Sequence, residues 1–395
     1  NGWNVKYYKG LGTSTSKEAK EYFVGIDKKL ITYFWEDVSN NQNAILDPND
    51  NSITKAFSKN RADDRKDWLL KYDKNNILKY EDTKVSYPEF IEKDMIHFSN
   101  DDLERSIPHI MDGLKPSQRK ILYGSFLRKL DKDEVKVAQL SGFVSDKAAY
   151  HHGEASLTGA IVGMAQDYVG SNNINILKPN GQFGTRIAGG KDHASARYIW
   201  TKLAELTSLI FRIADNPILK NQDDDGMPVE PENYAPIIPI ILVNGAKGIG
   251  TGFSTTIPQY NPIDIINNIT NLLNNKDYKI KSMKPWWNKF KGNVKKIDKN
   301  NFETHGIYKK EGDKLIITEL PIGESTTSYK NFLEKELEKE ANKKNRKTVK
   351  LVGYTDNNTD TKVYFELKFN KGKLNEIKDI AKSYRLIKKY STTNM

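Results

Sequence analysis

The chain changes character near Tyr234, and this change restricts the folds available to it. Before it, from Tyr87 to about Ala214, apolar residues recur mostly at helical spacing. After it, segment 234–258 is first apolar and then rich in glycine, and we expect a buried strand that turns into a loop. At roughly 100–200 residues per domain, 395 residues predict two or three domains. The fold class we expect is a multidomain α+β protein.

The helical part has recognisable starting points. Pro88 and Pro116 stand where proline is tolerated, in the first turn of a helix. We expect helices beginning near each, the second over 117–130, and a third over 155–169. In a basic protein, such a unit beside short strands suits a winged-helix or helix-turn-helix domain. The third helix places a row of apolar residues on one face, namely Leu157, Ile161, Met164, Ala165 and Val169.

The two ends of the chain are predicted more coarsely. Thr15 or Ser16 caps an expected helix over 17–23 with Glu18 in its first turn, residues 39–52 are expected to be a loop, and 61–70 a short helix. The C-terminal part is predicted as α+β, with helices over 262–275, 329–344 and 374–385 and strands over 314–320 and 363–369.

Charge and composition exclude several classes of protein. The net charge of +11 and isoelectric point near 9.2 favour a polyanionic partner, nucleic acid before membrane surface. A lysine-rich surface from an AT-rich genome explains the same charge. No cysteine is present, which removes disulfides and thiolate chemistry. The longest apolar stretch, near Ile237–Val243, is far shorter than the roughly 18–20 residues of a membrane span. With no signal region and no initiator Met, we expect a fragment of a longer protein.

Several candidate sites keep two readings each. Asp223–Asp225 is either a Mg²⁺ site or a solvated surface turn. The glycine-rich segment 245–252 either cradles phosphate or forms a tight turn, on which Ile249 is a core residue or a wedge between base pairs. The adjacent His151 and His152 do not suggest a zinc site, because neighbours on one element usually cannot ligate one metal.

Arg197 and Tyr198 lie between a glycine-rich polar flank and an apolar segment that starts at Ile199. Tyr198 is either a buried anchor or a nucleophile. A phenol has a pKa near 10, so attack at neutral pH needs a base or nearby cations. Arg197, Arg119 and His152 are candidates for that charge, because arginine gives fixed bidentate donors to phosphate oxygens.

Six segments then match one family in its own order: Lys6–Ser14, Asp112–Leu122, Ala148–Leu157, Tyr168–Asn173, Gly181–Tyr198 and Gly245–Pro258. Together they resemble the breakage-reunion core of type IIA DNA topoisomerases, of the eukaryotic type and its large-DNA-virus relatives. Residues 285–292 resemble the segment that enters the family's tower domain.

The resemblance implies roles for individual residues. Tyr198 matches the nucleophile that becomes linked to the 5′ end of a DNA strand. Arg197 and Arg119 match residues that bind the scissile phosphate, and His152 matches a histidine that stabilises it. Ile249 matches the isoleucine wedge that bends the duplex. The remaining candidates for DNA contacts are Lys9, Lys115, Lys120 and Lys191.

The resemblance also implies a domain plan and partners. Residues 1–35 are expected to be the end of a Toprim domain, 36–84 a linker, 85–235 a winged-helix domain carrying the tyrosine, and 236–395 a tower domain. The family's Mg²⁺-binding carboxylate motifs do not occur, so we expect no metal site in this chain. Mg²⁺ and ATP are expected to bind parts outside it, and the fragment is expected to be inactive alone. The implied partners are double-stranded DNA and a second copy of the chain, without membrane.

Two rival hypotheses remain at this point. One is a non-catalytic winged-helix DNA-binding module, and the other is a metal-dependent nuclease. The adjacent Arg197 and Tyr198 and the HHGE motif argue against simple binding, and the missing carboxylate set argues against a nuclease. The resemblance places the protein in a nucleus, or in host cytoplasm or virion if its source is a large DNA virus.

Overall fold

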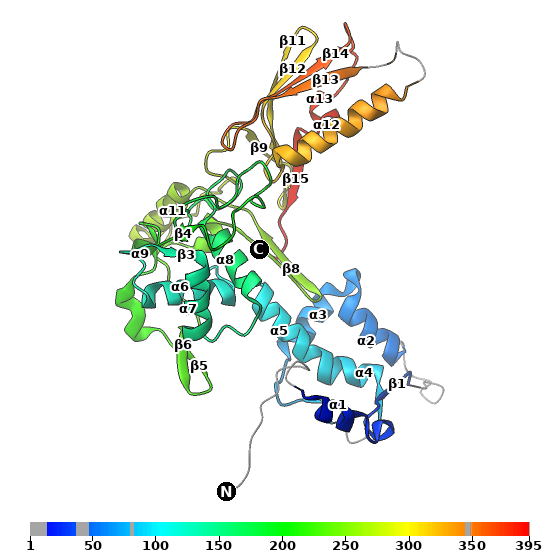
Figure 1. Ribbon diagram of the computed structural model, residues 1–395, viewed down its shortest axis with the longest axis vertical. Coiled ribbons are helices and arrows are strands. Elements are labelled where there is room, and N and C mark those ends of the chain that lie inside the picture. The colour runs from blue at the N-terminus through cyan, green and yellow to red at the C-terminus, as the bar shows by residue number, and fades with distance from the viewer. Residues whose placement is uncertain (1–13, 37–46, 80–82, 344–347, 349, 395) are drawn as a thin grey trace. The chain divides into compact units, whose positions relative to one another are not determined.

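The computed structural model describes residues 14–36, 47–79, 83–343, 348 and 350–394 (Figure 1). The chain divides into two compact units, residues 1–103 with 250–253 and residues 104–249 with 254–395. The division falls after residue 103, not after 84 as the sequence suggested. Segment 250–253 joins the first unit because Arg65 Nε donates to the Gly252 carbonyl and the Thr251 hydroxyl donates to the Asp102 carboxylate.

The first unit is mostly helical. The Thr15 side chain caps its first helix and Glu18 bonds back to the Thr15 N–H, which confirms the predicted helix start. Its elements are α1 (Ser16–Phe23), η2 (Ile26–Lys28), β1 (Thr32–Phe34), α2 (Pro48–Phe57), η3 (Lys59–Arg61), α3 (Ala62–Leu70), β2 (Lys84–Ser86), α4 (Tyr87–Phe90), the π-helical η4 (Ile91–Met95) and α5 (Ile96–Ser106).

The expected linker over 36–84 contains a small folded core. Ala56 of α2 and Trp68 of α3 are buried against Ile91 and Ile96. The Trp68 indole N–H donates to the Glu92 carboxylate at 2.8 Å. The sequence reading failed here because the apolar partners of α2 lie some 35–40 residues further along the chain, beyond any local pattern. Strand β1 also pairs with β2 in parallel, Thr32 opposite Lys84.

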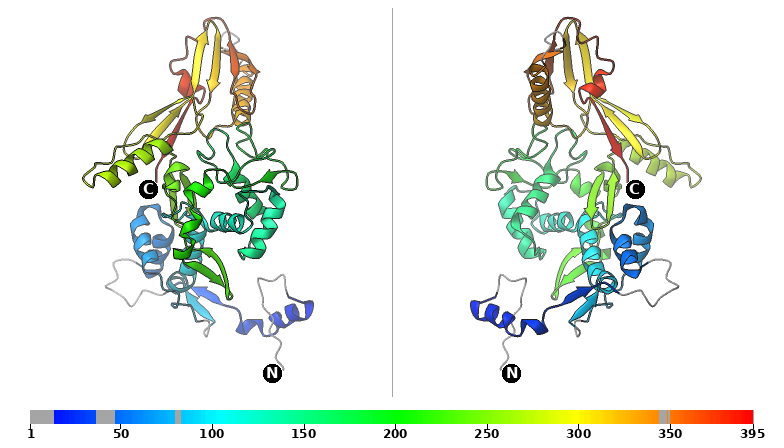
Figure 2. Two further views of the ribbon diagram at one scale, coloured as in Figure 1. Left: turned by 90° about the vertical axis from the view of Figure 1, so that its left-hand side faces the viewer. Right: turned by 90° about the vertical axis from the view of Figure 1, so that its right-hand side faces the viewer.

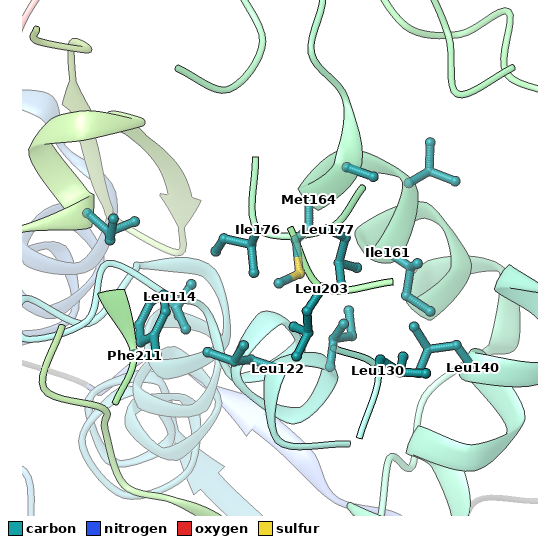
Figure 3. Packing of buried hydrophobic residues seen from close by; sticks show 14 of the residues in the cluster. Leu114, Leu122, Leu130, Leu140, Ile161, Met164, Ile176, Leu177, Leu203 and Phe211 are labelled. Atoms are coloured by element: carbon teal, nitrogen blue, oxygen red, sulfur yellow. The ribbon is translucent and has the colours of Figure 1, made fainter. Parts of the chain in front are cut away.

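The second unit begins with three helices around one large core, drawn in Figure 3. The helices are α6 (Pro116–Leu127), α7 (Val137–Lys147) and α8 (Glu154–Ala165), and β3 (Val135–Lys136) pairs antiparallel with β4 (Trp200–Thr201). The predicted face of α8 is buried through Leu157, Ile161, Met164 and Ala165, whereas Val169 lies beyond its end. Residues 166–199 form loops and turns, so the helical pattern was extended too far.

The same core continues through α9 (Thr207–Ile210), α10 (Ile240–Val243) and α11 (Pro262–Asn274), whereas η5 (Ile213–Ile218) has no buried residue. The expected buried strand after Tyr234 is wrong: the apolar run forms the short helix α10. Pro239 has no N–H to give to a strand ladder and stands instead at the helix N-cap. Because Val243 and Ile265 pack with Leu114 and Leu122, the core crosses the expected domain boundary at 235/236.

Two hairpins belong to this region of the chain. Strands β5 (Asn221–Asp224) and β6 (Met227–Pro231) form one, which Figure 2 shows extending from the helices. Strands β7 (Ala246–Gly250) and β8 (Phe253–Ile257) form the other, so the glycine-rich segment is a hairpin rather than a strand that leads into a loop.

The C-terminal part of the second unit is α+β, as predicted. A four-stranded antiparallel sheet has the order β11 (Ile307–Glu311), β12 (Lys314–Glu319), β14 (Phe365–Phe369) and β13 (Leu351–Asp356). Helix α12 (Thr326–Ala341) packs its Tyr329 and Leu333 against Leu315 and Phe365 of this sheet (Figures 1 and 2). A three-stranded sheet comprises β9 (Asn293–Lys296), β10 (Asn301–His305) and β15 (Ile387–Ser391). The expected helix over 374–385 is mostly turns, with only α13 (Ile380–Ser383).

Hydropathy adds one negative finding: among the residues placed by the structure, none of the helices combines the length and the apolar character that crossing a bilayer requires.

Candidate active site and nucleic-acid interface

Tyr198 stands on a short loop that is tied to the start of α7. The N–H groups of Val137 and Ala138, in the first turn of α7, donate to the carbonyls of Ile199 and Ala196 at 3.0 and 3.1 Å. These groups have no partner within the helix, so the loop satisfies them. Ile199 is 1% exposed and anchors the loop in the core. The loop is therefore rigidly attached at both sides of Tyr198.

The tyrosine itself points to solvent. Its side chain is 71% exposed, although the next residue, Ile199, is buried. A tyrosine that anchored the core would be buried with its hydroxyl paired. The reading of Tyr198 as a buried anchor is therefore wrong, and the phenol is accessible to a large substrate.

Arg197 is the cation nearest to this phenol on the chain. It is exposed, and its guanidinium carbon lies 5.7 Å from the centre of the Tyr198 ring. A cation at this distance over an aromatic face is attracted to the ring. The pair places a phenol hydroxyl and a guanidinium, a group able to give two parallel hydrogen bonds to an oxyanion, on one exposed loop.

Arg119 is placed differently from the prediction. It is 4% exposed, and its Nε and Nη2 donate to the two carboxylate oxygens of Asp112 at 2.7 and 3.1 Å. The Leu114 carbonyl accepts a third hydrogen bond from it. The Asp112 carboxylate also receives the Tyr234 N–H. The expected direct contact with a phosphate does not fit this geometry, because the guanidinium is already engaged inside the core.

Lys120 is also directed inward. Its Nζ donates to the Ala148 carbonyl at 2.6 Å and to the Glu230 carboxylate at 2.9 Å, and its side chain is 18% exposed. The expected DNA contact of Lys120 is therefore not supported. The sequence does not show this, because Glu230 lies 110 residues further along the chain.

His152 is exposed and lies in the turn between α7 and α8. Its ring meets that of Tyr150 edge-on, with centroids 5.4 Å apart. Partial desolvation lowers the pKa of His152 below its ordinary 6.5, helped by the positive charges of Arg105, His151 and Lys120. His152 is therefore a neutral imidazole at neutral pH, able to donate one N–H. The neighbouring His151 points to a different partner, the Asp224 carboxylate, at 3.0 Å.

The structure brings Arg197 to Tyr198 but attaches the histidine elsewhere. Within the described ranges, no hydrogen bond, ion pair or ring contact joins Tyr198 to Arg119 or His152. The tyrosine loop is held at the first residues of α7, and the turn with His152 follows its last. A helix of 11 residues is about 16 Å long.

Ile249 is exposed, as the wedge hypothesis requires. Its side chain is 69% exposed on β7, near the tip of the hairpin. At the turn between β7 and β8, Gly252, with φ of +74°, takes the left-handed conformation that favours glycine. Gly248 is needed for another reason: a Cβ there would approach the Ser106 carbonyl oxygen to 2.6 Å.

The remaining lysines differ in exposure. Lys191 is exposed on the loop before the tyrosine. Lys115 is half-buried at the start of α6, beside a cavity of about 540 Å³, and burial lowers its pKa. Lys9 lies outside the described residues, so its expected DNA contact has no structural description.

The acidic cluster resolves as a turn. Asp225 and Gly226 form the tip between β5 and β6, both with positive φ, and the Gly226 N–H donates to the Asp223 carboxylate. In the described part of the chain, no three or more His, Cys, Asp or Glu side chains come together to hold a metal ion. The Mg²⁺ reading of Asp223–Asp225 therefore has no structural support.

Two residues at this site were missed from the sequence, Asp112 and Glu230. Asp112 lies in the turn before α6, seven residues before Arg119 in the same motif, so the sequence did place the two charges close together along the chain. Glu230 carried none, because a carboxylate on a hairpin is normally solvated.

Two family models together match almost the whole chain. Residues 105–395 match the model of the family formed by the A subunit of DNA gyrase/topoisomerase IV, and residues 1–103 match that of the C-terminal associated domain of TOPRIM. The chain is 46% identical over 398 residues to DNA topoisomerase 2 of Plasmodium falciparum, covering 100% of this chain and 27% of the relative. It is 45% identical over 373 residues to DNA topoisomerase 2 of Acanthamoeba polyphaga mimivirus, covering 84% and 29%.

Among solved structures, the chain is similar to the DNA-binding, cleavage and re-ligation domain of Plasmodium falciparum topoisomerase II. The TM-score is 0.79 at 45% identity, and the match covers 100% of this chain and 52% of the other. The chain thus spans 27% and 29% of the length of the two relatives named above.

Proposed function

Because the chain belongs to the family of type IIA DNA topoisomerases, we propose that it is the DNA-binding and strand-cleaving core of such an enzyme. The observation that carries this proposal is the exposed Tyr198 on a loop fixed to the start of α7, with Arg197 beside its ring. A module that only bound DNA would not need this pair on a rigid loop.

The proposed step is a reversible transfer of a phosphodiester. The Tyr198 hydroxyl oxygen attacks the phosphorus of a DNA backbone phosphate, and its proton leaves as the new P–O bond forms. The bond from phosphorus to the 3′ oxygen breaks, and that oxygen takes up a proton. The product is a 5′-phosphotyrosine link and a free 3′ hydroxyl. One ester replaces another, so the reverse reaction reseals the strand without an external energy source.

Arg197 would donate to the oxygens of the phosphate under attack, where negative charge develops. Preorganised donors of this kind are each worth roughly 10²–10³ in rate. His152, as a neutral imidazole, would donate an N–H to a phosphate oxygen. Since it is attached at the other end of α7 from Tyr198, a second copy of the chain is a natural source of one of these groups. We propose a homodimer, in which two tyrosines cut the two strands of one duplex.

The proposed DNA contacts are those of the exposed candidates. Ile249 would enter between base pairs from the β7–β8 hairpin, and an inserted apolar side chain kinks a duplex by roughly 20–90°. Lys191 and the half-buried Lys115 would contact phosphates, whereas Lys120 is engaged with Glu230. Lys9 remains a candidate without a structural description.

Cofactors and location are part of the same proposal. Strand passage in this family would require ATP and Mg²⁺, which we place on parts of the enzyme outside this chain. Among the described residues, no three or more His, Cys, Asp or Glu side chains come together to hold a metal ion. The relatives are eukaryotic and viral, which supports a nucleus, or the host cytoplasm or virion, as the location.

A trapping experiment on the intact enzyme tests the proposal. Denaturing the enzyme during cleavage of a labelled duplex should leave DNA covalently attached to protein. Digestion and mass spectrometry should then find a nucleotide phosphate on the peptide that contains Tyr198. Binding of DNA without any covalent product would instead favour the non-catalytic module, and free 5′-phosphate ends without protein would favour a nuclease.

A further inference from the structure

The turn that carries His152 is held in an unusual backbone conformation. We call residues 148–152 the histidine turn. Ala149 within it has φ of +47°, a left-handed conformation that is strained for a residue with a Cβ. Ala148 is fully buried and Ala149 is 8% exposed. Such a conformation persists only where the surrounding structure determines it, so specific contacts must hold this turn.

A partly buried ion pair supplies those surroundings. Lys120 Nζ donates to the carbonyl of Ala148, the residue before the left-handed position, at 2.6 Å. The same Nζ lies 2.9 Å from the carboxylate of Glu230, which is 1% exposed on β6. The Glu230 carboxylate offsets part of the cost of taking the lysine head group out of water. Helix α6 and strand β6 thus fix one carbonyl of the turn.

An aromatic contact between Tyr150 and His152 connects the histidine ring to the rest of the turn. Tyr150 is 9% exposed, and its N–H donates to the Ser145 carbonyl at 3.3 Å. Its ring meets the His152 ring at 76°, the edge-to-face arrangement that aromatic pairs prefer. The imidazole, although exposed, is therefore not free to turn in any direction. Its place depends on Tyr150, and that of Tyr150 on the turn.

We propose that Lys120 and Glu230 are positioning residues that hold the histidine turn so that His152 can reach the scissile phosphate. The inference rests on the proposed function for its consequence, but not for its geometry. With its ammonium group bound by the Ala148 carbonyl and the Glu230 carboxylate, Lys120 acts on the reaction through Ala148 and His152.

The test compares two lysine variants, each of which removes the cation of an ion pair; one pair is partly buried and the other is exposed. Lys120→Met removes the cation from the partly buried pair with Glu230. Lys220→Met removes the cation from an exposed ion pair with Glu232, which lies two residues after Glu230. The side chains of Lys220 and Glu232 are 79% and 49% exposed. Lys120→Arg serves as the rescue, since it restores a cation able to reach both partners. The histidines are labelled with ¹³C at Cε1, and the His152 signal is assigned with His152→Gln.

Two readouts separate positioning from simple destabilisation. In the chain, the ring current of Tyr150 should shift the His152 Cε1–H signal, and Lys120→Met should move that signal to the value of an unstructured histidine. In the intact enzyme at saturating DNA, Lys120→Met should lower the covalent adduct by roughly 10²-fold, the loss typical of a misplaced group, with DNA affinity changed less than about twofold. Lys120→Arg should recover most of both, and Lys220→Met should change neither.

An unchanged His152 signal and unchanged adduct in Lys120→Met would overturn the proposal, as would equal losses in Lys220→Met. If Lys120→Met does not fold, Glu230→Gln carries the test, because the amide oxygen still accepts from Lys120 while the negative charge is gone. It should shift the His152 signal and reduce the adduct in the same direction; a wild-type result would again overturn the inference. Wild-type enzyme that forms no adduct would refute the proposed function, while the signal of His152 would still test the geometry.

Discussion

Arg119 and Asp112 form a buried bidentate ion pair, with Nε and Nη2 of the arginine 2.7 and 3.1 Å from the two carboxylate oxygens. The Asp112 carboxylate also accepts the backbone N–H of Leu114 at 3.0 Å and of Tyr234 at 3.0 Å. The pair therefore connects the start of α6 to a segment more than 110 residues further along the chain. The pair therefore stabilises the fold beneath the candidate site and is not part of its exposed surface.

This pair predicts a large loss of stability on breaking it. Removing one partner leaves a buried uncompensated charge, at a cost of about 3–5 kcal/mol. Arg119→Met should lower the free energy of unfolding of the chain by this amount in denaturant titration. Arg197→Met, at an exposed position, should change it by less than about 0.5 kcal/mol. If Arg119→Met has normal stability but no longer cleaves DNA, the result would instead support the hypothesis that Arg119 binds the scissile phosphate.

Ile249 should matter for DNA shape and not for stability. It is 69% exposed, so Ile249→Ala should change the free energy of unfolding by less than about 0.5 kcal/mol. The fully buried Ile121 is the matched control, and Ile121→Ala should cost about 2–5 kcal/mol. Energy transfer between dyes at the two ends of a short duplex should show a smaller bend with Ile249→Ala. Normal bending with a lowered melting temperature would support the core reading.

DNA binding should depend strongly on salt, and only some lysines should contribute. Each phosphate neutralised adds about −0.9 to the slope of log K against log salt. Lys191→Met should therefore make the slope shallower by about 0.9, because Lys191 is exposed beside the tyrosine loop. Lys120→Met should leave the slope unchanged, because its charge is engaged with Glu230. If the DNA affinity of the wild type does not depend on salt, the net charge of +11 belongs to solvated surface side chains that do not bind DNA.

His152 should titrate below its ordinary pKa of 6.5 in the free chain. Because the folded state disfavours its proton, the unfolded chain binds that proton more readily just below pH 6.5. The stability that this histidine contributes is thus complete above pH 6.5 and falls as pH drops through the lowered pKa. Histidine NMR should show the lowered midpoint, and a bound duplex should raise it, since phosphate charge favours imidazolium. The NMR signal of His97, whose ring is hydrogen-bonded to the Tyr72 hydroxyl, is the internal control. If DNA changes both histidine signals equally, His152 does not contact the phosphate.

The sequence was sufficient where local chemistry decides the structure. The Thr15–Glu18 capping box, the apolar face of α8 and the helix α11 were all predictable because their signals lie within a few residues. The exposed Tyr198 was not, since burial and exposure at that position fit the local pattern equally.

The errors arose where residues distant in the chain meet. Lys120 has the sequence context of a surface cation, but Glu230 pairs with it. The expected linker is folded because Trp68 within it packs with Ile91 and Ile96. The apolar run after Tyr234 looked like a strand, but Pro239 prevents a ladder and the core offers a place for a helix. Each case is a tertiary partner that local periodicity does not report.

Comparing two tyrosine variants of the intact enzyme tests the assignment of the nucleophile most directly. Tyr198→Phe removes one oxygen from an exposed side chain, and Tyr308→Phe removes the same atom from another exposed tyrosine on β11. With a labelled duplex and denaturant quenching, Tyr198→Phe should form no covalent protein–DNA adduct while binding DNA with nearly wild-type affinity, and Tyr308→Phe should form the wild-type amount. Adducts that persist in Tyr198→Phe would contradict the assignment.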